Sequence, residues 1–276
     1  MYKIEDIINK VHNADCLLAM KEIPDKSIDM ILCDLPYGTT ACKWDTIIPF
    51  EPLWDQYKRI IKDNGAIVLT ASQPFTSALV MSNIKDFRYE LIWDKKRSSG
   101  FALANKMPLK THENILIFYK KLPTYNPQKW LSTPYNKEKY NKLNNSQITG
   151  DKIFKQNKKN NGLRFPVSVN YFSQNWTRQQ QIHPTQKPVA LFEYLIKTYT
   201  NEGDLVLDNC AGSGTLGIAA INTKRNYILI EKELKYCKIA EKRLKEIQPT
   251  CKYKATEPSP RKRRINVAFG AMFIKI

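Results

Sequence analysis

Residues 204–215 read DLVLDNCAGSGT and contain the strongest indication of the fold. The apolar run Asp204–Leu207 predicts a short buried strand, and the small residues that follow predict a tight turn into a helix beginning near Thr215. A strand, a glycine-containing turn and a helix form the repeating unit of proteins with a parallel sheet. The segment therefore predicts an α/β fold.

The same turn can admit a ligand. Its small residues let backbone N–H groups approach a bound molecule closely, and the positive end of the following helix favours a carboxylate or phosphate there. A tight turn without a ligand also uses glycine. Glu231 favours the ligand, because it lies 23 residues beyond Asp208, where nucleotide-binding folds place the acid that hydrogen-bonds a ribose. A dinucleotide and an S-adenosyl cofactor both fit. The predicted cofactor residues here are Asp208, Ala211, Gly212, Ser213, Gly214, Thr215 and Glu231.

The rest of the chain repeats the strand–helix alternation on both sides of a less regular middle. Helices with apolar stripes are expected at 52–62, 189–200, 215–221 and 234–247, and Asp63-Asn64-Gly65 is expected to end the first of them as a turn. Further strands are expected at Ile28–Cys33, Ala66–Thr70, Tyr89–Trp93, Asn114–Tyr119 and Tyr227–Ile230.

A second informative segment is Asp34-Leu35-Pro36-Tyr37, which ends the apolar run at 28–33. It leaves an acceptor side chain, a rigid backbone carbonyl and a flat ring at the carboxyl end of a buried strand, where open α/β sheets place their chemistry. This combination suits recognition of an amine. The alternative is a strand followed by a structural Pro-Tyr turn.

Positive charge is concentrated in two parts of the chain. The net charge is +18, of which residues 95–180 carry +14 and residues 251–276 carry +6, so the remainder is nearly neutral. This distribution predicts a polyanion-binding surface added to a catalytic core. Lys95-Lys96-Arg97 is the candidate phosphate clamp, with Arg164 and Arg178 further along the basic segment. The tail run 261–264 is expected to be a solvated end.

Aromatic residues recur through the polar segment from about 120 to 180. Rings interleaved with Lys and Arg can stack on bases, but a segment this polar also needs rings in order to fold. We expect most of them to form a small core. They are Tyr125, Trp130, Tyr135, Tyr140, Phe154, Phe165, Tyr171, Phe172 and Trp176.

Several classes of protein are disfavoured. The six cysteines form no C-x-x-C pair, which argues against zinc and against a disulfide framework, and no metal is expected. The N-terminus lacks the apolar core of a signal peptide, and no run of 18 apolar residues occurs. We expect a cytoplasmic protein with no membrane contact.

The two motifs together resemble those of the amino-group DNA methyltransferases, which use S-adenosylmethionine to methylate exocyclic amines of adenine or cytosine. The amine tetrapeptide precedes the cofactor turn, with the basic segment between them, and this order is similar to that of the β group. The resemblance implies a Rossmann-like methyltransferase fold, mostly parallel with helices on both faces, in circularly permuted order. It covers about 1–120 and 181–247; we assign no motif of the family to residues 120–180.

The resemblance also assigns residues outside the two motifs. Asn13–Leu17 resembles the segment that approaches the cofactor's adenine, through Asp15 and Cys16. The stretch His183–Pro188 resembles the one that contacts the methionine end, through His183, Thr185 and Lys187. Alternatively, His183 is a structural or solvent-facing histidine that does not contact the cofactor. The implied organisation is a catalytic half (1–120), a target-recognition insertion (121–180), a cofactor half (181–250) and a basic tail (251–276).

The implied function is methylation of adenine N6 in duplex DNA, within a restriction-modification system. The flipped base would stack on Tyr37, and its amine would donate to Asp34 and to the carbonyl of Leu35. An acid in the first position favours adenine. The family usually has proline in the second position, where this chain has leucine. N4-cytosine methylation, RNA or protein-amine methylation, and a non-catalytic DNA-binding scaffold remain alternatives, and a homodimer is left open.

Overall fold

The computed structural model describes residues 3–40, 42, 45–136, 159–173 and 186–247. The chain divides into two compact units. The first unit includes everything described up to Lys129 and from Phe165 onward, and the second includes the described part of Trp130–Arg164. Every α-helix found among the described residues belongs to the first unit, as does the main sheet.

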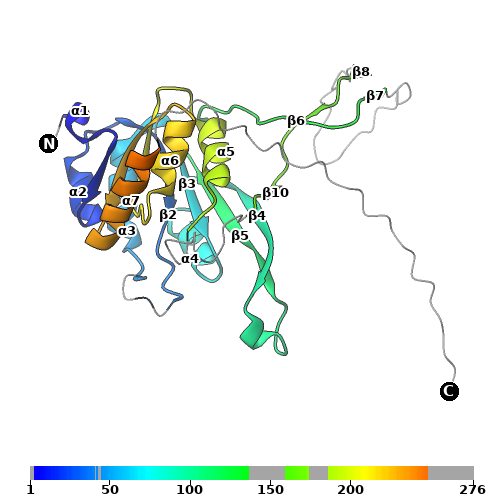
Figure 1. Cartoon of the computed structure of the whole chain (residues 1–276), viewed down its shortest axis with the longest axis horizontal. Helices are drawn as coiled ribbons and strands as arrows, with labels where there is room; N and C mark the ends of the chain where they lie inside the picture. Colours follow the sequence, from blue (N-terminus) through cyan, green and yellow to red (C-terminus); the bar gives the residue numbers. More distant parts are fainter. Residues whose placement is uncertain (1–2, 41, 43–44, 137–158, 174–185, 248–276) are drawn as a thin grey trace. The chain divides into compact units, whose positions relative to one another are not determined.

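The first unit alternates helices and strands along the chain (Figure 1). Its N-terminal part contains α1 (Ile4–Ile7), β1 (Lys10–Asn13), α2 (Cys16–Glu22), β2 (Ile28–Asp34), α3 (Phe50–Ile60), β3 (Ile61–Ala71), α4 (Phe75–Ser82), β4 (Phe87–Ser99), the 3₁₀ turn η1 (Phe101–Leu103) and β5 (Lys110–Phe118). Its C-terminal part contains β10 (Val169–Tyr171), α5 (Val189–Tyr199), β11 (Leu205–Asp208), α6 (Thr215–Asn222), β12 (Asn226–Glu231) and α7 (Leu234–Glu246).

Eight strands form one sheet in the order β1-β12-β11-β2-β3-β5-β4-β10. The pairs from β1 to β3 are all parallel, β5 runs antiparallel to both of its neighbours, and β10 is parallel to β4. The chain leaves β2 toward β3 and leaves β11 in the opposite direction toward β12. The strand order therefore reverses between β2 and β11, and such a switch point opens a crevice at the carboxyl ends of the two strands. The predicted Rossmann-like methyltransferase fold is confirmed.

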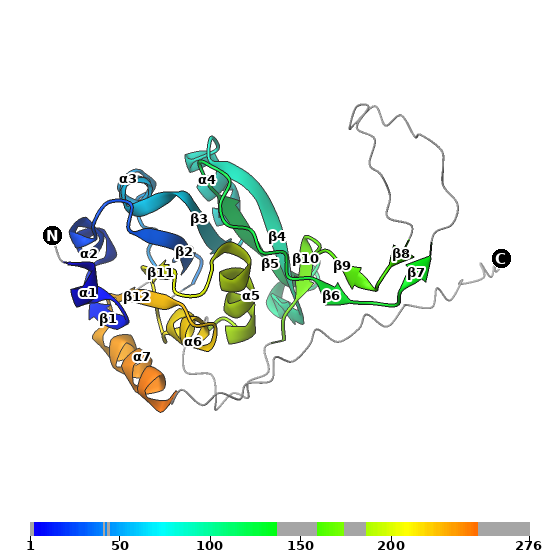
Figure 2. The ribbon, with the colours of Figure 1, turned by 90° about the horizontal axis from the view of Figure 1, so that it is seen from above.

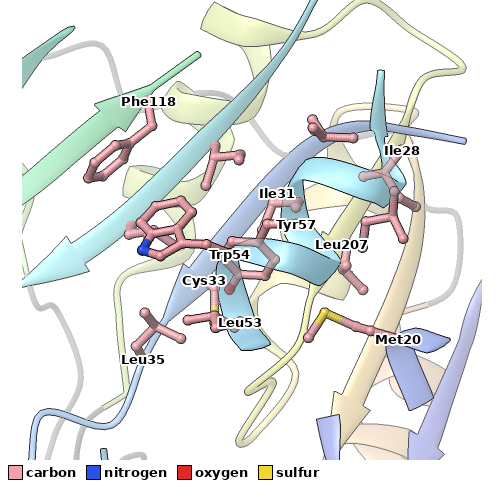
Figure 3. Packing of buried hydrophobic residues seen from close by; sticks show 14 of the residues in the cluster. Met20, Ile28, Ile31, Cys33, Leu35, Leu53, Trp54, Tyr57, Phe118 and Leu207 are labelled. Carbon is pink, nitrogen blue, oxygen red and sulfur yellow. The ribbon is translucent and has the colours of Figure 1, made fainter. Parts of the chain in front are cut away.

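Helices cover both faces of the sheet and bury two apolar layers (Figure 2). On one face, Leu53, Trp54 and Tyr57 of α3 pack against alternate residues of β2 such as Ile31 and Cys33 (Figure 3). On the other face, the apolar side of α5 packs with α6 against the residues of β2 that point the other way. Since both faces are buried, the central strands read as continuous apolar runs.

The strands and helices expected from the sequence are confirmed, although β3 begins earlier, at Ile61, and β4 continues to Ser99; the turn predicted at 63–65 is wrong. These residues lie inside β3, where Ile61 pairs with Ile28 and the next paired residue is Ala66, opposite Met30. The intervening residues form a bulge. A Cβ on Gly65 would come within 2.8 Å of the Asp29 carbonyl oxygen, so this glycine serves the close approach of two strands.

The second unit has two short antiparallel pairs, β6 (Trp130–Leu131) with β9 (Leu163–Arg164) and β7 (Tyr135–Asn136) with β8 (Lys159–Asn160). The expectation of an aromatic core is wrong for three rings of the first unit, because Tyr125, Phe165 and Tyr171 are exposed. Cations cover two of them instead, with Lys129 over Phe165 and Lys96 over Tyr171. Phe172 is partly buried against α5. Tyr140, Phe154 and Trp176 lie outside the described residues.

Among the described residues, no helix combines the length and the apolar character that crossing a bilayer requires.

Candidate functional site

A cavity of about 680 Å³ lies at the switch point, beyond the carboxyl ends of β2, β11 and β12. Loops that follow these strands form its walls, and β4, β5 and α5 close it on one side. Most of the residues predicted for the site line it. These are Asp15, Cys16, Asp34, Leu35, Pro36, Tyr37, Lys95, Arg97, Lys187, Asp208, Ala211, Gly212, Ser213, Thr215 and Glu231.

Asp34, the last residue of β2, is held by three donors. Its Oδ1 accepts hydrogen bonds from the hydroxyls of Tyr37 (2.7 Å) and Thr70, and its Oδ2 accepts one from Nζ of Lys187 (2.7 Å). Thr70 stands directly opposite Asp34 in the parallel pairing of β2 with β3. Each carboxylate oxygen has two acceptor directions, so Oδ2 can still accept one further hydrogen bond from a ligand.

Tyr37 is fixed at both ends of its side chain. The ring stacks on Phe75 of α4 with centroids 5.2 Å apart and planes inclined by 27°, while the hydroxyl lies within hydrogen-bond distance of Asp34 and Thr70. Burial, followed by the nearby Asp34 carboxylate, raises the pKa of Tyr37 well above its ordinary value. The phenol therefore stays neutral and can donate.

An alternating row of charges runs from Asp34 along the cavity wall. Lys187 Nζ lies 3.3 Å from Oε2 of Glu113, whose Oε1 accepts a hydrogen bond from Lys95 Nζ at 2.9 Å. Burial alone would lower the pKa of Lys187, but Asp34 and Glu113 raise it above its ordinary value. Burial likewise opposes ionisation of Glu113, yet Lys187 and Lys95 bring its pKa below the ordinary value. Both residues are thus charged at neutral pH.

The second half of the cavity has the features of a nucleotide cradle. Oε2 of Glu231 accepts from the N–H of Gly212 and Oε1 from the N–H of Glu233, both at 2.8 Å, so the carboxylate at the end of β12 has a fixed orientation. Burial raises its pKa. Gly214 has φ +77°, and a Cβ there would come within 2.8 Å of the Ala240 Cβ in α7. Gly214 thus serves the left-handed turn and the close packing of α7, while Gly212 and Ser213 line the cavity just before α6.

Asp208 closes the floor between the two halves. It is buried, and this desolvation raises the pKa of its carboxyl to about 7. Its Oδ1 accepts the N–H of Cys210 at 3.0 Å. Burial together with the neighbouring carboxylates therefore makes this group far more basic than an exposed aspartate.

Three cysteines distant in sequence meet beneath the cofactor side of the cavity. The thiols of Cys16 and Cys33 interact with that of Cys210; this interaction lowers the pKa of Cys16, while burial raises the pKa of Cys33 to about 12. The Cys16 backbone begins α2, which Asp15 caps by accepting the N–H groups of the next turn at 3.0 and 3.3 Å.

The predicted DNA-binding residues differ in their surroundings. Lys95 is mostly buried in its ion pair with Glu113, which leaves Lys96 and Arg97 as the exposed cations of that trio. Arg164 belongs to the second unit, where it donates to the Thr133 carbonyl at 2.7 Å. His183, Thr185 and Arg178 lie outside the described residues.

Sequence reasoning missed Glu113, Thr70 and Phe75, although two of them left a signal. Thr70 is a polar residue at the end of a buried strand, in the same position as Asp34 on the neighbouring strand. Glu113 precedes the apolar run of β5 and is the one acid among the residues of the basic segment that the structure describes. No pattern local to α4 marked Phe75, because its role depends on the packing of α4 over the tetrapeptide.

Comparisons with known proteins agree with this geometry. The chain is 28% identical to the type II methyltransferase M2.MboI of Moraxella bovis over 91% of this chain and 93% of that protein. It is also 28% identical to M.HinfI of Haemophilus influenzae, over 89% and 71%. The crystal structure of an M1.HpyAVI–SAM complex superposes with a TM-score of 0.57 at 25% identity, over 85% of this chain and 99% of that one. The cytosine-N4-specific PvuII methyltransferase shares the fold, with a TM-score of 0.61 at 15% identity and 84% coverage of each chain.

A sequence model of the family described as DNA methylase, which groups N6 and N4 enzymes, matches residues 28–242. This match runs from the first residue of β2 into α7, so it includes both halves of the cavity. The chain therefore belongs to the N6/N4 DNA methylase family.

Proposed function

We propose that this protein transfers a methyl group from S-adenosylmethionine to the N6 amine of an adenine flipped out of duplex DNA. The observation that carries the proposal is the position of Asp34. Its carboxylate ends β2 inside a cavity that also contains the Gly212–Glu231 cradle, so an amine acceptor and a nucleoside site share one chamber. An acid in the first position of the tetrapeptide supports adenine as the base.

The residues of the cradle fit the proposed cofactor. The Glu231 carboxylate is suited to the ribose hydroxyls, the small residues 211–213 to close approach of the backbone, and Asp15 and Cys16 to the adenine side. When bound, S-adenosylmethionine supplies an electrophilic methyl group on a positively charged sulfur. The ion pairs of Lys187 with Asp34 and Glu113 fix the orientation of the Asp34 carboxylate.

The protein's part in the reaction is positioning and electrostatics. Asp34 Oδ2 and the carbonyl of Leu35 accept the two hydrogens of the target amine, which turns the nitrogen lone pair away from the ring and toward the methyl donor. The nitrogen that accepts the methyl would then lose one proton, which Asp34 Oδ2 is positioned to receive. Tyr37 supplies the flat surface for the base, with Phe75 supporting its ring from behind.

Nucleoside analysis tests the proposal. Duplex DNA is incubated with the protein and methyl-labelled S-adenosylmethionine, digested, and separated into nucleosides. Label in N6-methyladenine supports the proposal, and label in N4-methylcytosine replaces it with the cytosine reaction. Asp34→Asn is the matched control, because it keeps the shape of the side chain but removes its charge; labelling should fall by about 10²-fold or more. The absence of labelled base with the unaltered protein would sink the proposal.

A further inference from the structure

The long hairpin of β4 and β5 extends beyond the rest of the sheet and ends in a compact turn (Figure 1). The regular ladder pairs Asp94 with His112 and then continues at Ser99 with Lys110. Beyond that pair the chain turns through Gly100, which has φ +85°, into η1. We call residues 95–110 the arm.

The tip of the arm exposes apolar side chains on a backbone that is held in place. Phe101 is 68% exposed, Met107 55% and Leu103 42%. Backbone hydrogen bonds from Leu103 to Gly100 (2.9 Å) and from Met107 to Leu103 (3.0 Å) close the turn. Apolar side chains that are exposed on an ordered turn are typical of a surface that binds a partner.

The arm is also strongly basic and continuous with the cavity. Residues 95–110 contain five Lys or Arg and no Asp or Glu. Lys95, Arg97, Ser99 and Lys110, at the base of the arm, line the cavity that holds Asp34. The base of the arm therefore belongs to the reaction site and includes the exposed Arg97, whereas the tip extends away from that site and includes the exposed Lys106.

We propose that the tip of the arm is a wedge, in which Phe101 enters the base stack of the duplex where the target adenine leaves it, while Lys106 at the tip and Arg97 at the base of the arm contact the flanking phosphates. This inference rests on the proposed function and adds the element that opens the duplex. An apolar side chain between base steps replaces stacking that is lost when a base is displaced. The wedge is thus a positioning element and takes no part in methyl transfer.

Charge complementarity selects DNA over a second copy of the chain as the occupant of this surface. In a symmetric dimer formed through the arm, two segments with five cations each and no acid would face one another. Duplex DNA offers phosphates for the cations and apolar base faces for the ring. The surface therefore matches a nucleic acid in both of its components.

The test compares Phe101→Ala with Met81→Ala, a matched truncation of an exposed apolar residue on α4 (69% exposed) outside the cavity lining. Single-turnover methylation is measured on a duplex that contains the site identified by sequencing DNA methylated by the wild-type protein, and on the same duplex with an abasic position opposite the target adenine. Phe101→Ala should lose about tenfold or more on the intact duplex and regain most of that loss on the abasic one, where the adenine is already poorly stacked. Met81→Ala should match the wild type on both.

A fluorescence measurement without methyl transfer makes the test independent of turnover. With 2-aminopurine in place of the target adenine, wild-type protein should raise the fluorescence on binding, and Phe101→Ala should raise it much less at equal occupancy. An unchanged rate and signal in Phe101→Ala overturn the wedge. An equal loss of methylation rate on both duplexes also overturns the wedge. If Phe101→Ala loses activity and its molecular mass in solution falls to half that of the wild type, the tip is a dimer interface instead. Failure of the wild type on both duplexes contradicts the proposed function itself.

Discussion

Lys187 Nζ lies 2.7 Å from Oδ2 of Asp34, and this contact joins two segments separated by more than 150 residues. Both side chains are mostly buried. From the sequence, Lys187 was expected to contact the methionine end of the cofactor. In the structure the Lys187 ammonium lies between the carboxylates of Asp34 and Glu113. This position suggests a second role, in which Lys187 orients Asp34, the residue that accepts a hydrogen bond from the target amine.

Replacing Lys187 with methionine distinguishes these two roles. If the lysine orients Asp34, kcat should fall by about 10²-fold or more with little change in KM for S-adenosylmethionine, because the loss is specific to the reacting geometry. If the lysine mainly binds the cofactor, KM should rise while kcat stays near its original value. Initial rates over a range of cofactor concentrations separate the two outcomes.

Lys187→Arg is the control for charge. It keeps a cation between two carboxylates but changes the geometry, so it should recover part of the lost kcat. The methionine variant should also be less stable by about 3–5 kcal/mol, since it leaves two buried carboxylates with one remaining cation. Urea unfolding measures this difference; equal stability and equal kcat in both variants would contradict the role assigned to the contact.

Leu35 should contribute to stability more than to chemistry. Its side chain is 4% exposed and belongs to the apolar layer between β2 and α3 (Figure 3). Leu35→Ala should lower the free energy of unfolding by about 2–5 kcal/mol. Because the backbone carbonyl remains, kcat at a temperature where the variant is folded should stay within a few fold of wild type. Leu35→Met, which nearly conserves volume, should preserve both; a large loss of kcat in a stable Leu35→Met variant would show that the side chain itself takes part.

The sequence predicted those parts of the site that lie at strand ends. Asp34 follows a buried apolar run, and Glu231 follows the next strand after the glycine turn, so their positions depend on local pattern and on the rule that strand ends meet. Glu113 and Phe75 depend on tertiary packing: the first reaches Lys187 only because β5 runs antiparallel beside β3, and the second reaches Tyr37 only because α4 lies over the tetrapeptide. The bulge at 63–65 was mistaken for a turn because polar residues and glycine signal both.

The buried Asp208 should make stability depend on pH. Its folded pKa is about 7, above the ordinary value of 3.8, so the folded state holds a proton that the unfolded state releases at lower pH. The stabilisation is complete below about pH 4 and is lost as pH rises toward and through 7, by a few kcal/mol in total. Urea unfolding of wild type and Asp208→Asn should show the wild type losing stability relative to the variant between pH 5 and pH 8. A pH-independent difference would contradict the assignment.

Cys16 should be the thiol whose reactivity reports cofactor binding. It lines the cavity, and its interaction with the Cys210 thiol lowers its pKa, so a larger fraction of it is thiolate at neutral pH than for an ordinary cysteine. Iodoacetamide should therefore modify Cys16 quickly, and S-adenosylmethionine should slow this reaction severalfold by covering the cradle. Cys42, which is partly exposed and outside the cavity lining, is an internal control whose rate should not change. Peptide mass spectrometry follows both residues in one sample, and equal protection of the two, or protection of neither, would place the cofactor elsewhere than beside Cys16.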